Sequence, residues 1–392
     1  MEEQKTLALA KLREYPFRLL PGERVTVWAG YADVRDKLLR IVETPRTDRV
    51  GLYEFAILWG ELGTGKSHAL RYLKYQIAEE FRDEFQSPVV YLDTLKLEAK
   101  TTFMSIFRAT MASLEDRFVE VGRALDATVN RIVTEEWKEQ QSQSSLFTEP
   151  EFREKRRKQI LEGLCHGFPA LPRLLIATKD GDQRALSILK GNKHKPEELR
   201  PFGLTNSIEN DYDAVRCFGQ FVNLTTNPVV SGASPIFKAV YLFLDELEII
   251  QDFKPEQIMS INQGIRDLLN ACPEHFCLLC GFTGSIEALE GFLESAVMAR
   301  LTAVPLEVPP LETNQAVEFL TQVLAFYRLD DSDPREYPFT KETLGEIVAK
   351  TTTKTPRNLF KNARVVLERS VLDGKLVPGG TIAIELVDAY LD

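Results

Sequence analysis

The chain has 392 residues, of which 44% are apolar and 27% are charged, and its formal net charge is −10. This length suits one large or two ordinary domains, and the negative charge excludes a protein whose whole surface is basic enough to coat nucleic acid. No apolar run reaches the roughly 18 residues of a membrane span, and charges interrupt the N-terminal residues where a signal peptide would be apolar. Five scattered cysteines fit a reducing compartment better than a disulfide framework. We therefore expect a folded cytoplasmic protein that crosses no membrane.

A glycine-rich loop joins a predicted buried strand, residues 51–60, to a predicted helix that begins at residue 66. Its sequence GELGTGKS fits the pattern G-x-x-x-x-G-K-[ST]. The N–H groups of such a loop surround phosphates, the lysine bridges the terminal phosphates and the serine hydroxyl binds Mg²⁺. The alternative is a glycine turn without a ligand. The expected nucleotide-binding residues are Gly60, Glu61, Leu62, Gly63, Thr64, Gly65, Lys66, Ser67 and His68, with His68 packing or supporting rather than catalytic.

A second predicted strand, residues 87–93, ends in Asp93 and is followed by Thr94. Two interpretations stay open for this end: a polar group that senses the γ-phosphate, or an ordinary strand end.

Residues 101–235 are predicted to form a mainly helical insertion, because a βαβ crossover needs only roughly 30 residues and this segment has helical periodicity. Thr148 and Glu151 form a capping box at the start of one helix. Arg153, Arg156 and Arg157 share a face of that helix, and KGNKHK at 190–195 is a second basic segment. These charges either contact DNA phosphates or only solvate a surface.

The apolar run at residues 236–244 is predicted to be a central strand, and it ends in Asp245 and Glu246. An aspartate in this place holds the Mg²⁺ hydration shell, and Glu246 is placed to polarise a water for attack on the γ-phosphate. The alternative is two acids that begin a surface loop. Glu248 is close in sequence, and we assign it no catalytic role.

Residues 275–285 are predicted to be another strand, whose polar end carries Thr283. Thr283 is either a polar sensor at the nucleotide or part of the cap of the next helix, where Ser285 suits the N-cap position. Cys272, His275, Cys277 and Cys280 lie in the same segment, but side chains alternate along a strand, so Cys277 and Cys280 face opposite sides. We expect core cysteines and no zinc site.

From residue 311 onward the pattern is helical, with Pro356 suited to the first turn of a helix. Together the glycine-rich loop, LFLDELE, Thr283, the arginine of ESAVMARLTAVPLEVPPL and Pro356-Arg357 resemble AAA+ ATPases of the origin-recognition-complex type, over residues 15–375. Within that group, ALSILKGN, FGLTNSIENDYDAVRCFGQFV and YLFLDELEII are similar to ATP-binding proteins of bacterial phage-exclusion systems.

The resemblance implies an α/β P-loop NTPase fold, a parallel sheet flanked by helices, with a helical insertion and a C-terminal helical lid. It divides the chain into the first part of the core (1–100), the insertion (101–235), the rest of the core (236–310) and the lid (311–392), with residues near the N-terminus covering the adenine. It implies ATP and Mg²⁺ as ligands, Arg300 as a finger that reaches a neighbour's γ-phosphate, and Arg357 as a second sensor in the same subunit. A homo-oligomer, ring or filament, follows if Arg300 acts in trans.

Other nucleotide chemistries fit less well. A small-molecule kinase does not need the later acids, arginines and lid in this order, and the nearest match to a guanine-reading motif, residues 178–181, lacks its final Asp. We expect ATP hydrolysis that switches assembly within a DNA-directed machine for phage defence, transposition targeting or replication loading. The winged-helix domain usual in origin-recognition proteins is not expected after the lid, so DNA contact would come from the insertion, pore loops or a partner protein. The competing class is a signalling or protein-remodelling module without DNA contact.

Overall fold

A parallel five-stranded sheet lies at the centre of the computed structural model, which describes residues 2–20, 22, 24–47, 55–93, 102–141, 148–229, 234–304 and 306–391. The strands are β1 (Phe55–Gly60), β2 (Val89–Leu92), β3 (Val240–Leu244), β4 (Phe276–Thr283) and β5 (Leu306–Glu307). Their order is β2-β3-β4-β1-β5, and the pairings are parallel. Residues 51–54 of the first predicted strand, and Thr94 after the second, lie outside the described residues.

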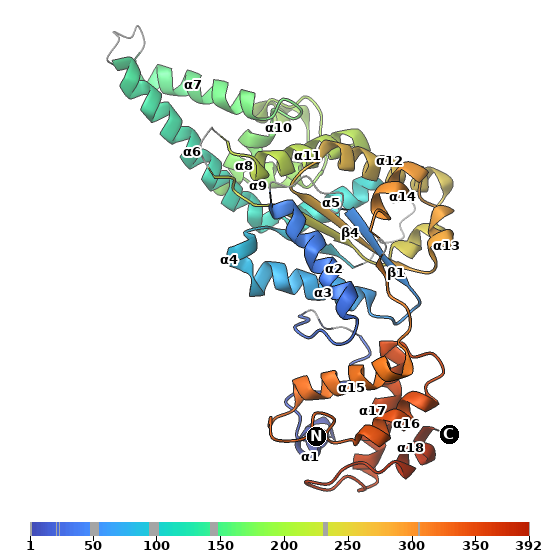
Figure 1. Cartoon of the computed structure of the whole chain (residues 1–392). Coiled ribbons are helices and arrows are strands. Elements are labelled where there is room, and N and C mark those ends of the chain that lie inside the picture. The colour runs from blue at the N-terminus through green and yellow to red at the C-terminus, as the bar shows by residue number, and fades with distance from the viewer. Residues whose placement is uncertain are drawn as a thin grey trace.

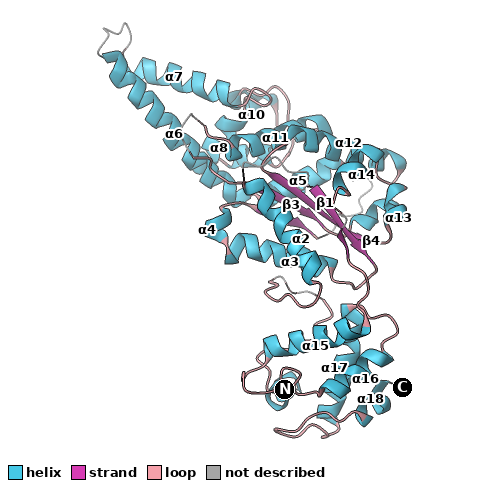
Figure 2. Ribbon diagram, in the orientation of Figure 1, coloured by secondary structure: helices cyan, strands magenta, loops and turns pink. Residues whose placement is uncertain are grey.

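Alternating side chains give the sheet two apolar faces, each covered by helices (Figure 2). Tyr241 and Phe243 pack on one face with α2 (Ala32–Glu43) and α3 (Lys66–Tyr75). Leu242 and Leu244 pack on the other face with α5 (Phe103–Ser113), α11 (Asp211–Thr226) and α12 (Pro255–Ala271). The structure thus confirms the predicted fold class, an α/β P-loop sheet flanked by helices.

The cysteines follow the same alternation. Cys277 belongs to the cluster on the α2 and α3 face, whereas Cys280 belongs to the cluster on the opposite face. In the described part of the chain, no group of three or more His, Cys, Asp and Glu side chains is arranged to hold a metal ion. Within the same part, no helix combines the length and apolar character that a bilayer crossing requires.

Helices between β2 and β3 extend the molecule away from the sheet. They are α6 (Glu115–Gln141), α7 (Glu149–Leu164), α8 (Leu171–Lys179), α9 (Gln183–Leu189) and α10 (Pro196–Leu199), and α6 and α7 form an arm (Figure 1). The predicted capping box opens α7, where the Thr148 N–H donates to Glu151 at 3.1 Å. Apolar side chains of α6 and α8, such as Leu125 and Leu174, join the cluster under the sheet. The insertion therefore shares its core with the sheet.

The basic face of α7 points at α6. Arg156 pairs with Glu136 at 2.6 Å, Arg157 with Asp126 at 2.5 Å, and Arg153 donates to Thr134 at 3.1 Å. These contacts join the two helices of the arm. In the structure the three arginines therefore bind side chains of α6, whereas the sequence suggested either DNA phosphates or solvent as their partners. In the second basic segment, Lys190 pairs with Glu115, and Lys193 pairs with Glu209 at 3.1 Å.

A second body of helices stands at the opposite end of the molecule from the arm (Figure 1). It contains α15 (Thr313–Tyr327), α16 (Lys341–Lys350), α17 (Pro356–Leu372) and α18 (Glu385–Leu391), and we call it the lid. The other helical elements are η1 (Thr44–Arg46), η2 (Gln76–Glu80), α4 (Arg82–Phe85), η3 (Arg200–Phe202), η4 (Leu247–Asp252), α13 (Ile286–Glu290) and α14 (Ser295–Leu301).

The N-terminal residues belong to the lid, which corrects their predicted place in the core (1–100). Helix α1 (Glu2–Ala10) lies beside the lid helices, and Leu12, Tyr15 and Phe17 are buried in the lid cluster. The Arg13 N–H donates to the Tyr327 carbonyl at 2.7 Å. The physical reason is that these apolar side chains cover α15 and α17, which would otherwise expose their inner faces.

Candidate functional site

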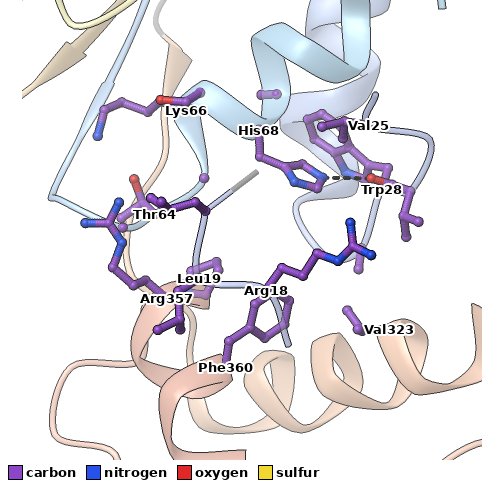
Figure 3. A pocket seen from close by; sticks show the side chains of 18 of the residues that line it. Arg18, Leu19, Val25, Trp28, Thr64, Lys66, His68, Val323, Arg357 and Phe360 are labelled. Carbon is purple, nitrogen blue, oxygen red and sulfur yellow. Dashed lines mark hydrogen bonds between the residues drawn. The ribbon is translucent and has the colours of Figure 1, made fainter. Parts of the chain in front are cut away.

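A pocket of about 670 Å³ lies where the sheet, the lid and the segment that joins them meet (Figure 3). Its walls come from the glycine-rich loop, the ends of β3 and β4, described residues between Arg13 and Val34, and the lid helices α15 and α17. This volume is in the range of small-molecule and cofactor sites, roughly 300–1,000 Å³. The lining residues predicted from the sequence are Leu62, Gly63, Thr64, Gly65, Lys66, Ser67, His68, Asp245, Glu246, Thr283 and Arg357.

The glycine-rich loop runs from the end of β1 to the first turn of α3. Gly65 immediately precedes Lys66 with φ 108°, a left-handed conformation that glycine adopts at little cost, and a Cβ added there would meet nothing within 4 Å. The backbone is therefore open to a ligand at the point where the helix begins. The free N–H groups and partial positive charge of a helix N-terminus favour an anion in this place.

Lys66 is a buried cation at the base of this loop. Its side chain amine donates to the carbonyls of Gly60 at 2.9 Å and Glu61 at 2.8 Å. Burial lowers the pKa of Lys66 to about 8, although Glu248 and Asp245 oppose the shift. A phosphate group in the pocket would supply the negative charge that favours the ammonium form.

Acidic residues face this lysine from the end of β3. Asp245 is buried, and its carboxylate accepts hydrogen bonds from the Tyr91 hydroxyl at 2.7 Å and the Glu246 N–H at 3.0 Å. Glu246 is exposed and has a left-handed backbone, with φ 53°. Glu248 accepts from the Thr283 N–H at 2.9 Å, so it ties the end of β4 to the loop after β3. Ser285 caps α13, as predicted, by accepting from the Ala288 N–H.

The donor set fits magnesium bound to a phosphorylated ligand. The Ser67 hydroxyl and the Asp245 carboxylate line the same pocket as Lys66, and oxygen atoms of this kind are the ligands that Mg²⁺ prefers. A Mg²⁺ ion held by these residues would neutralise phosphate charge. Sequence reasoning had not included Tyr91, which contacts Asp245 from the neighbouring strand.

The other end of the pocket is lined by aromatic and apolar side chains together with Arg18 (Figure 3). His68 is hydrogen bonded to the Val27 carbonyl at 2.7 Å (Figure 3), and because a carbonyl only accepts, the proton lies on Nε2. Burial lowers the pKa of His68. Trp28, Val323 and Phe360 line the same end. This composition suits a flat, largely apolar group such as a nucleobase.

Arg357 reaches the pocket from the lid. It lies in the first turn of α17, after Pro356 and the N-cap residue Thr355. Its backbone N–H donates to the Gly63 carbonyl at 3.2 Å, and a Cβ on Gly63 would stand 2.8 Å from the Arg357 Cβ. Lid and loop are thus in direct contact, and Arg357 lines the pocket of its own chain.

Arg300 lies elsewhere. It is exposed near the end of α14 and donates to the Asn270 side chain at 2.8 Å. Gly60, at the end of β1, and Glu61 contribute the carbonyls that hold Lys66. Of the predicted catalytic residues, the structure therefore brings Lys66, Glu246, Thr283 and Arg357 to one pocket and leaves Arg300 at another surface.

Comparison with known proteins finds remote structural likeness. No family model matches the sequence, and no curated protein matches it. The ORC1 protein of Aeropyrum pernix in complex with DNA shares 13% identity at a TM-score of 0.47, over 97% of this chain and 69% of that chain. The ORC2 protein of the same organism, in ADPNP-ADP complexes, shares 13% identity at a TM-score of 0.44, over 92% of this chain and 65% of that chain. NtrX from Brucella abortus in complex with ADP shares 13% identity at a TM-score of 0.39, over 94% of this chain and 56% of that chain. The fold class stated above rests on the strand order and the loop.

Nucleotide binding should take up protons at alkaline pH. In the free protein Lys66 has a pKa of about 8, and phosphate charge beside it raises that value. Below the lower pKa the amine is charged in both states, so uptake is absent; between the two values binding takes up about one proton and weakens as pH rises. Calorimetry of ATP binding in buffers with different ionisation enthalpies, at about pH 6.5 and about pH 8.5, measures this uptake. Equal binding heats in all buffers at the higher pH would contradict the assignment of Lys66.

Proposed function

We propose that the chain is an AAA+ ATPase that binds ATP with Mg²⁺ and hydrolyses the terminal phosphoric anhydride to switch its assembly state. The observation that carries this proposal is the common pocket of Lys66, Ser67, Asp245 and Glu246. A buried lysine, oxygen ligands for a metal and a carboxylate for a water molecule are the groups that phosphoryl transfer to water requires.

Each side chain has a role in this proposal. Lys66 and Arg357 counter the charge of the terminal phosphates from the loop and from the lid. Ser67 and Asp245 hold Mg²⁺, and Glu246 orients the attacking water. Thr283 offers a polar contact beside them, and Glu248 holds the Thr283 N–H, so it supports that strand end. The apolar end of the pocket takes the base.

Arg300 supplies the argument for an oligomer. In the described residues it contacts Asn270 and does not line its own chain's pocket. A guanidinium on an exposed surface is available to a neighbouring subunit, where it would stabilise the charge of the transferring phosphoryl group. We propose a homo-oligomer, ring or filament, in which Arg300 completes the next subunit's site.

The second part of the proposal concerns the compartment and the cellular process in which the ATPase acts. We place the ATPase in the cytoplasm, within a DNA-directed machine of phage defence, transposition targeting or replication loading, together with protein partners of that system. A signalling or protein-remodelling module without DNA contact is the second candidate. The pairing of Arg156 and Arg157 with carboxylates of α6 favours this second candidate, because it neutralises charge that would otherwise meet phosphates.

Glu246→Gln should bind ATP but hydrolyse it slowly, because the amide cannot accept the proton of the attacking water. The expected loss of turnover is roughly 100- to 10,000-fold, and the ATP-bound assembly should persist in sedimentation velocity. Glu290→Gln, which changes an exposed carboxylate on α13, is the matched control.

Rapid ATP hydrolysis by Glu246→Gln would show that Glu246 does not orient the attacking water. The trapped assembly also separates the two settings: DNA binding that weakens steeply with salt supports the DNA-directed machine. An assembly that ignores DNA at low salt supports the module without DNA contact.

Mixing Arg300→Ala with Lys66→Ala subunits should restore part of the ATPase activity that each variant lacks alone. The reason is that Lys66→Ala subunits retain the arginine, whereas Arg300→Ala subunits retain the complete pocket. Steady-state hydrolysis, compared with each variant at the same total concentration, measures the rescue. Co-assembled but inactive mixtures would show that Arg300 does not act across an interface.

A further inference from the structure

A tyrosine on the strand beside β3 reaches the carboxylate of Asp245. Tyr91 lies on β2 in register with Phe243, on the face covered by α3. Its hydroxyl donates to Asp245 Oδ2 at 2.7 Å. This is a short bond to a buried acid, and a carboxylate acceptor makes such a bond stronger than one between neutral groups.

A second side chain orients the tyrosine hydroxyl. Arg71, on α3, donates from Nε to the Tyr91 oxygen at 3.1 Å, and its guanidinium carbon lies 5.2 Å from the centroid of the Tyr91 ring. Because the phenol oxygen accepts from Arg71, its own proton is directed to Asp245. Arg71 also donates from Nη1 to the Gly22 carbonyl at 3.2 Å. Hydrogen bonds therefore connect the Gly22 carbonyl, which lines the pocket, through Arg71 and Tyr91 to Asp245.

Asp245 is fixed from its other side as well. Oδ1 accepts from the Glu246 N–H at 3.0 Å, and Gly281 on β4 leaves the space for this oxygen, since a Cβ there would stand 2.5 Å away. Both carboxylate oxygens are thus held, but each has a further lone pair. The arrangement limits rotation of the carboxylate without using up its capacity to accept hydrogen bonds from a hydrated cation.

We propose that Tyr91 is a positioning residue for magnesium: it holds Asp245 in the orientation that binds the Mg²⁺ of the nucleotide complex, and Arg71 connects it to the base end of the pocket. The inference rests on the proposed nucleotide-binding function. Hydrogen-bond partners of metal-binding side chains fix ligand orientation, and their removal typically weakens metal binding about ten- to a hundredfold.

The test is the factor by which Mg²⁺ tightens nucleotide binding, which needs no turnover. Calorimetry on the full chain compares the affinity for β,γ-imido ATP in EDTA with that in saturating Mg²⁺. Tyr91→Phe removes only the hydroxyl, so affinity in EDTA should stay at the native value while the Mg²⁺-dependent factor falls about ten- to a hundredfold. Arg71→Gln should lower the factor in the same direction, because the tyrosine proton loses its orientation.

Tyr241→Phe is the matched control. Tyr241 lies on β3 and its hydroxyl donates to the Val42 carbonyl at 2.5 Å, so the variant removes a buried phenol bond of the same sheet without touching Asp245. Its Mg²⁺-dependent factor should match that of the native chain. A native factor in Tyr91→Phe, or equal losses in both tyrosine variants, would overturn the positioning role alone. Absence of nucleotide binding by the native chain would overturn the proposed function and this inference together.

Discussion

The candidate site depends on one buried cation, Lys66, in the first turn of α3 after the loop that follows β1. The Lys66 amine lies between the Gly60 and Glu61 carbonyls, and burial lowers its pKa to about 8. Dipolar carbonyls hold an ammonium less well than a full negative charge does, and the nearby Asp245 and Glu248 offset the burial only in part. The site is therefore arranged for an anion. Glycines that leave the backbone open and the first turn of α3 serve that arrangement, whereas the acids at the end of β3 suit a cation that would accompany the anion.

The pocket joins two bodies of the molecule. Helix α1 packs in the lid, the following segment crosses to the sheet along the pocket, and the chain returns to the lid after β5 (Figure 1). Arg357 of the lid touches the loop through the Gly63 carbonyl. A ligand in the pocket would contact the loop, the crossing segment and the lid at once, so it would influence how the lid sits on the sheet. This arrangement supports the proposed coupling of hydrolysis to a change of assembly.

The fold and the part of the pocket around the glycine-rich loop could be predicted from the sequence because short-range patterns encode them. A loop motif between a strand and a helix located Lys66, and an apolar run ending in acids located Asp245. Alternation correctly separated Cys277 from Cys280. Contacts between distant segments left no such signal: Leu12 and Phe17 pack on the lid, and Tyr91 bonds Asp245 across 154 positions. The arginines of α7 shared a face as expected, yet their carboxylate partners on α6 could be identified only from the packed helices.

The central claim is that Lys66 and Asp245 form one binding site for a magnesium nucleotide. Equilibrium binding of ATP and Mg²⁺ to the native chain and to Lys66→Ala measures it most directly. Loss of charged hydrogen bonds to the phosphates predicts affinity about ten- to a hundredfold weaker in the variant, with the fold unchanged by circular dichroism. Equal affinity in the two proteins would place the nucleotide elsewhere and contradict the account.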